Sequence, residues 1–125
     1  MNNLESLRKS PVYWHRRQSL NELRKQKPMF EQLMAQTRRC MDLHPELAND
    51  ITGAIQCETI HPQTLSDYAN FTFHTHPHNI AYPSQKDIET TTRLNKEYLL
   101  IGLAQQNKVV AFHKDDKYKR LVARF

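Results

Sequence analysis

Glycine, cysteine and long apolar runs are all scarce in this 125-residue chain. Its only glycines are Gly53 and Gly102, which excludes the common glycine-rich phosphate-binding loops. Cys40 and Cys57 lack the CxxC spacing of a cysteine zinc site. No apolar run approaches the roughly 20 residues of a membrane-spanning helix, and the first ten residues lack the apolar stretch of a secretory signal. We therefore expect a cytoplasmic protein with both cysteines reduced.

The length is that of one domain, but the net charge of +5 is unevenly distributed. Residues 1–27 carry seven Lys or Arg against two Glu, whereas the rest of the chain balances eleven basic with eleven acidic residues. A basic segment can contact nucleic acid or an acidic partner. A solvated helix face is the simpler interpretation, and we expect neither a nucleic-acid nor a membrane partner. Residues 1–27 are predicted to form a basic helical extension, followed by the main unit at 28–125.

Two helices are predicted before residue 45. Ser10 followed by Pro11 is typical of a helix start. Lys27-Pro28 should end this helix, because a residue before proline avoids the helical conformation. From Pro28, apolar residues recur at three- and four-residue spacing, which predicts a second amphipathic helix.

The remaining pattern predicts strands and one further helix. Residues 51–57 and 70–76 read as strands, and the second alternates with Phe71 and Phe73 on one face and the histidines on the other. A helix is predicted from Ser84 to about residue 98, with Leu94 facing inward. Residues 99–104, 108–114 and 120–125 suit an antiparallel meander. The expected fold is α+β, a mostly antiparallel sheet flanked by helices in a single domain with an N-terminal helical extension.

The segment FHTHPHNIAYPSQKD, residues 73–87, carries the candidate chemistry. His74 and His76 are two residues apart on a predicted strand, so their imidazoles point to one face and can converge on one ion. Asp87, in the first turn of the next predicted helix, can supply a third ligand. Two histidines and a carboxylate form a known hydrolytic zinc ligand set with an open fourth position.

Ser84 precedes Asp87 by three residues, and the pair has two interpretations. The Ser84 hydroxyl could donate a hydrogen bond to a developing oxyanion. Alternatively, Ser-x-x-Asp is a capping box that does no more than start a helix, worth about 1 kcal/mol. Taken alone, the pair favours the cap.

The combined pattern of His74-Thr75-His76-Pro77, seven intervening residues and Ser84-Gln85-Lys86-Asp87 resembles the JAMM motif of MPN+ domains. The resemblance extends over most of the chain from about Pro28. It implies an MPN/JAMM-like (cytidine-deaminase-like) fold and a zinc metallopeptidase. Such enzymes cleave the peptide or isopeptide bond after the C-terminal glycine of ubiquitin or a ubiquitin-like, sulfur-carrier-type modifier. It further implies one zinc ion held by His74, His76 and Asp87, with Ser84 at the oxyanion.

The family also uses an upstream glutamate as general base, and here this sequence departs from the pattern. Counting back from Gly53 places Asp50 at that position, whereas the His-Pro-Glu context points to Glu46. An aspartate is one methylene shorter, and a misplacement of about 1 Å can cost of order a hundredfold in rate. Register favours Asp50 slightly over Glu46, and Glu58 is a weaker third candidate.

Two other functions are compatible with these residues. With a short or misplaced base, the chain would be a catalytically weak or inactive MPN-like interaction module. His78 extends the histidines to HxHxH, which resembles the histidine-triad nucleotide hydrolases. That pattern requires a continuing strand, which Pro77 interrupts, and it leaves Asp87 without a role.

Overall fold

The computed structural model describes residues 11–43, 69–76 and 80–125 and shows an α+β fold. The elements in chain order are α2 (Pro11–Lys25), α3 (Lys27–Leu43), β1 (Phe71–His76), α6 (Gln85–Arg93), β2 (Tyr98–Leu103), β3 (Lys108–His113), the 3-10 helix η2 (Lys114–Asp116) and β4 (Leu121–Arg124). The predicted strand at 51–57 lies outside the described residues. None of the described helices is long and apolar enough to cross a membrane.

The four described strands form one mixed sheet in the order β1-β2-β3-β4. β1 pairs in parallel with β2, with His74 opposite Ile101. β2 and β3 are antiparallel, as are β3 and β4. The predicted meander of the last three strands is therefore confirmed. The parallel strand β1, joined to β2 through α6, makes the sheet mixed.

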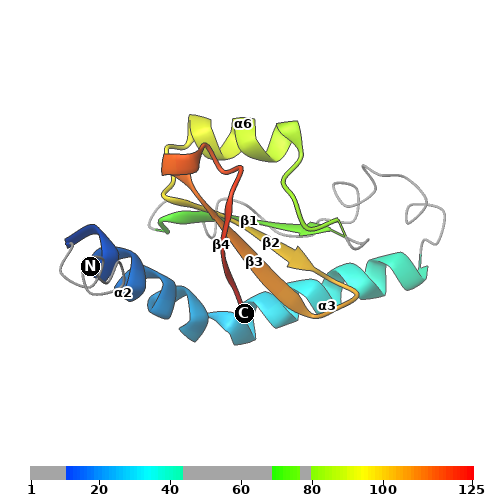
Figure 1. The fold of residues 1–125 in the computed structure, drawn as a ribbon. Helices are drawn as coiled ribbons and strands as arrows, with labels where there is room; N and C mark the ends of the chain where they lie inside the picture. Colours follow the sequence, from blue (N-terminus) through cyan, green and yellow to red (C-terminus); the bar gives the residue numbers. More distant parts are fainter. Residues whose placement is uncertain (1–10, 44–68, 77–79) are drawn as a thin grey trace.

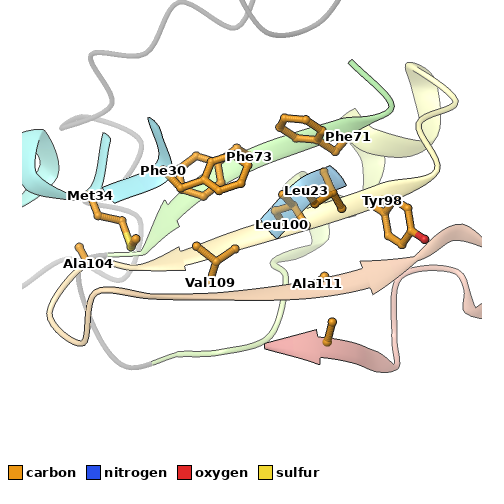
Figure 2. Packing of buried hydrophobic residues seen from close by; sticks show 11 residues of the cluster. Leu23, Phe30, Met34, Phe71, Phe73, Tyr98, Leu100, Ala104, Val109 and Ala111 are labelled. Atoms are coloured by element: carbon orange, nitrogen blue, oxygen red, sulfur yellow. The ribbon is translucent and has the colours of Figure 1, made fainter. Parts of the chain in front are cut away.

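Helices cover both faces of this sheet (Figure 1). α2 and α3 lie against one face, where Leu23, Phe30 and Met34 pack with β-sheet residues such as Phe73 and Leu100 (Figure 2). α6 lies over the opposite face, and its Ile88 packs against a second cluster. That cluster consists of Leu99, Ile101, Leu103, Val110, Phe112 and Tyr118. Because both faces are covered, every residue of β2 is buried.

The N-terminal helix α2 packs on the sheet as part of the domain. Leu23 is 1% exposed within the core, and the Ser19 hydroxyl lies 2.6 Å from that of Tyr98. Arg16 donates to Asp115 at 2.7 Å. The predicted break before Pro28 is present, but α3 begins one residue earlier than predicted, at Lys27. A helix N-terminus tolerates proline because its first N–H groups have no intrahelical acceptor.

Three expectations from the sequence are wrong. α6 ends at Arg93 rather than near residue 98, and Leu94 is 40% exposed instead of facing inward. The cause is Asn95, which adopts a left-handed conformation with φ of 52° and terminates the helix. Cys40 on α3 is disulfide-bonded, so the expectation of a reduced thiol fails there.

Candidate metal centre

β1 brings His74 and His76 to the sheet face that α6 covers. Along this strand buried and half-buried residues alternate, as the sequence predicts. Phe71 and Phe73 point into the core cluster beneath α3. The two histidines therefore lie on the opposite face, two residues apart, toward the start of α6.

The start of α6 holds Asp87 in place through a complete capping box. The backbone N–H of Asp87 donates to the Ser84 Oγ at 3.1 Å, and the Ser84 N–H donates to the Asp87 Oδ2 at 3.0 Å. The capping interpretation of Ser84 is therefore confirmed. The cap uses an oxygen lone pair of Ser84 and not its hydroxyl proton. A capped serine can therefore still donate a hydrogen bond.

The structure brings His74, His76 and Asp87 into direct contact. His74 Nδ1 lies 3.2 Å from Asp87 Oδ1, and His76 Nε2 lies 3.1 Å from Asp87 Oδ2. All three side chains are 10 to 15% exposed. Residues separated by eleven and thirteen positions in sequence thus form one largely buried cluster of two imidazoles and a carboxylate.

Burial and mutual contact determine the charges of this cluster. Burial lowers the pKa of His74, although the Asp87 carboxylate opposes this effect. Burial would raise the pKa of Asp87. The hydrogen bond from His76, the charge of His74 and the Ser84 N–H outweigh it and lower the pKa of Asp87 to about 2. At neutral pH, Asp87 is therefore ionised and His74 is neutral.

The tautomer of His76 follows from its second hydrogen bond. Its Nδ1 lies 2.8 Å from the backbone carbonyl oxygen of Ile80, which can only accept, so Nδ1 carries the donated proton. In the neutral ring, Nε2 then presents a lone pair to the Asp87 Oδ2. Two acceptors at this distance repel unless a cation, either a proton or a metal ion, lies between them. A histidine whose outer N–H donates to a carbonyl is the arrangement typical of metal ligands.

The donor set fits zinc, but the three side chains are not arranged around a common point. Within the described ranges, no group of three or more His, Cys, Asp or Glu is positioned to hold a metal ion. The reason is visible in the contacts, because each imidazole faces a different oxygen of Asp87. Metal binding requires both nitrogens and one carboxylate oxygen to turn toward a shared position.

The candidate general bases cannot be placed relative to this cluster. Asp50, Glu46 and Glu58 lie outside the described residues, and so does His78. Of the predicted catalytic residues, only Ser84 is described, at the exposed start of α6.

A second cluster of histidines and a carboxylate has no signal in the sequence. Glu97 Oε2 lies 2.9 Å from His15 Nε2 and 3.2 Å from His113 Nε2. Here the outer nitrogen of the buried imidazole, His113 Nδ1, accepts from the backbone N–H of Asp115 at 3.1 Å. Its Nε2 must therefore carry a proton, which it donates to Glu97. This cluster is satisfied without a metal. Its members come from α2, from the residue before β2 and from the end of β3.

Comparisons with known proteins identify no relative: no family model, no curated protein and no solved structure matches this chain.

Proposed function

We propose that this protein is a zinc-dependent metallopeptidase of the JAMM/MPN+ type. It would hydrolyse the peptide or isopeptide bond after the C-terminal glycine of ubiquitin or a ubiquitin-like, sulfur-carrier-type modifier. The proposal depends on the resemblance of His74-Thr75-His76-Pro77 and Ser84-Gln85-Lys86-Asp87 to the family motif. The α+β fold with a helix-covered sheet is consistent with it.

The observation that carries the proposal is the chemistry of the buried contacts around Asp87. The carboxylate is ionised, and its contact with His76 Nε2 requires a proton or a metal ion between the two atoms, because the proton of the neutral imidazole is used by Nδ1 in the hydrogen bond to Ile80. Burial lowers the pKa of His74 below its usual value, which favours the neutral imidazole that a metal ion requires. The cluster therefore has the donors of a zinc site and an excess of negative charge that a cation would neutralise.

Zinc held by His74, His76 and Asp87 would supply a Lewis acid and lower the pKa of a water molecule. Asp50 or Glu46 would take the proton from that water and pass it to the leaving amine. The hydroxyl of Ser84 would donate a hydrogen bond to the carbonyl oxygen as negative charge develops there. Its place at the start of α6 suits this role, because a helix N-terminus favours negative charge.

The extended C-terminal tail of the modifier would bind by adding to a strand edge. Among the described strands, β1 and β4 are the outer ones. β1 also carries His74 and His76, so a tail along it would bring its last peptide bond toward the cluster.

Cleavage of a reporter amide on the C-terminal glycine of ubiquitin, or of a sulfur-carrier-type protein, tests this proposal. We expect zinc-dependent cleavage by the unmodified protein and loss of at least a hundredfold in Asp87→Asn. Glu97→Gln is the matched control, because it makes the same change beside two histidines in the metal-independent cluster. Full activity of Asp87→Asn would show that Asp87 is not a ligand.

A second candidate function is a catalytically weak or inactive MPN-like interaction module. The observation that favours it is that His74, His76 and Asp87 already contact one another with no shared metal position. Asp50→Glu and Glu46→Gln separate the two functions in the same assay. A large rise in Asp50→Glu would indicate an attenuated site. A loss in either variant identifies that residue as the base.

A further inference from the structure

We infer that Thr72 and Thr91 are positioning residues that fix the tautomer of His74 and thereby direct its Nδ1 at the metal position. The inference rests on the proposed function for its metal, but the tautomer itself belongs to the metal-free protein. Neither threonine is part of the motif that indicates the site.

The hydroxyl of Thr91 determines which atom donates in each hydrogen bond between Thr91, Thr72 and His74. The Thr91 hydroxyl donates to the backbone carbonyl of Asp87 at 2.8 Å, which commits its only proton. The 2.6 Å contact between Thr72 and Thr91 must then be a donation from Thr72. With its own proton used, Thr72 can only accept from His74 Nε2, which lies 3.0 Å away.

The consequence is a single tautomer of His74. Nε2 carries a proton, so in the neutral ring Nδ1 holds the lone pair, and its 3.2 Å contact with Asp87 Oδ1 needs a cation between the two atoms, as the contact of His76 does. The chain of hydrogen bonds begins at the Asp87 carbonyl and ends at His74 Nε2, and the other nitrogen of His74 faces the Asp87 carboxylate, so one network lies between two of the proposed ligands. It also joins the middle of α6 to β1.

Burial makes this network effective. Thr91 is fully buried and Thr72 is half-buried, between β1 and α6. Water competes poorly there, and a hydrogen bond in a low-dielectric interior is electrostatically stronger than in water. Valine at either position would preserve the shape of the side chain but remove the hydroxyl, and with it the hydrogen bonds that orient His74.

The opposite face of β1 offers a matched control. Thr37 on α3 donates to Thr75 at 2.9 Å, which is also a buried threonine pair joining a helix to this strand. No histidine takes part in the contact between these two hydroxyls. Thr37→Val therefore repeats the chemical change of Thr72→Val in a contact with the same strand, away from His74.

The test combines nitrogen-15 NMR of the imidazoles in the chelator-treated protein with zinc affinity from competition against a chelator. We expect His74 to show the Nε2–H tautomer, and Thr72→Val to produce a mixture or the Nδ1–H form. Zinc affinity should fall about ten- to a hundredfold, the usual effect of losing an outer-shell partner. Thr72→Ser should restore both values, and Thr37→Val should change neither.

Thr91→Val supplies a second route if Thr72→Val does not fold, because it removes the acceptor of the Thr72 proton. An Nδ1–H tautomer in the unmodified protein would overturn the inference. An unchanged tautomer and an unchanged zinc affinity in both valine variants would also overturn the inference. If the unmodified protein still bound zinc, this result would not contradict the proposed function. Conversely, a tautomer that responds to Thr72→Val in a protein that binds no zinc would confirm the positioning role and contradict the proposed function.

Discussion

Replacing Asp87 by Asn in the metal-free protein should remove an acid-dependent part of its stability. Contacts with His76, His74 and the Ser84 N–H outweigh burial and lower the pKa of Asp87 from 3.8 to about 2. Each pKa unit corresponds to about 1.4 kcal/mol, so the folded state gains about 2 kcal/mol from the ionised carboxylate. Because the folded pKa is below the unfolded value, this stability is present above pH 3.8 and is lost as pH falls through about 2.

Urea unfolding at a series of pH values, with chelator present, measures this effect. The measured quantity is the difference in free energy of unfolding between the unmodified protein and Asp87→Asn. This difference should be about 2 kcal/mol larger at about pH 5 than at pH values below 2. Glu22→Gln controls for the loss of one negative charge, because Glu22 is exposed on α2 in a surface ion pair. A difference between the unmodified protein and Asp87→Asn that stays constant across this range would refute the reasoning.

Three further predictions concern the scaffold. Gly102→Ala should destabilise by about 1–3 kcal/mol, since its Cβ would lie 2.5 Å from the Phe73 Cζ; chemical denaturation checks this, and unchanged stability would contradict the packing. Thr37→Val should cost about 1–3 kcal/mol by leaving the buried Thr75 hydroxyl without its donor; the double variant with Thr75→Val should recover much of the loss, and equal losses would be inconsistent with the pairing. Leu23→Ala should cost about 2–5 kcal/mol if α2 is part of the core; a thermal midpoint equal to that of the unmodified protein would show that it is not.

The elements that the sequence predicted are those specified by local signals. The alternation in residues 71–76 and the cap at Ser84 depend on neighbours within a few positions, and both are present. The hairpins after β2 and β3 follow from short polar turns between apolar runs. The end of α6 was missed because Asn95 in a left-handed conformation is one of several residues that could have ended that helix.

The parallel pairing of β1 with β2 is a different case. It depends on the α6 crossover, which the sequence pattern indicated only as a helix between two strands. The register that sets His74 opposite Ile101 comes from packing on both faces of the sheet, and a strand pattern alone does not specify its partner.

In the candidate metal centre, the sequence motif identified the proposed ligands but not the residues that orient them. Spacing alone indicated that His74, His76 and Asp87 could meet. The residues that orient them, Thr72 and Thr91, carry no motif and are recognised only from distances across two elements. Likewise, nothing in the sequence connects His15, Glu97 and His113, which are far apart in the chain.

The most direct test of the central claim is the zinc content of the purified protein, measured by elemental analysis beside Asp87→Asn and Glu97→Gln. We predict about one zinc ion per chain in the unmodified protein and in Glu97→Gln, and little in Asp87→Asn. Absence of zinc from all three proteins after incubation with added metal would contradict the account. The contacts among His74, His76 and Asp87 would then belong to a strand and a capped helix and not to a metal centre.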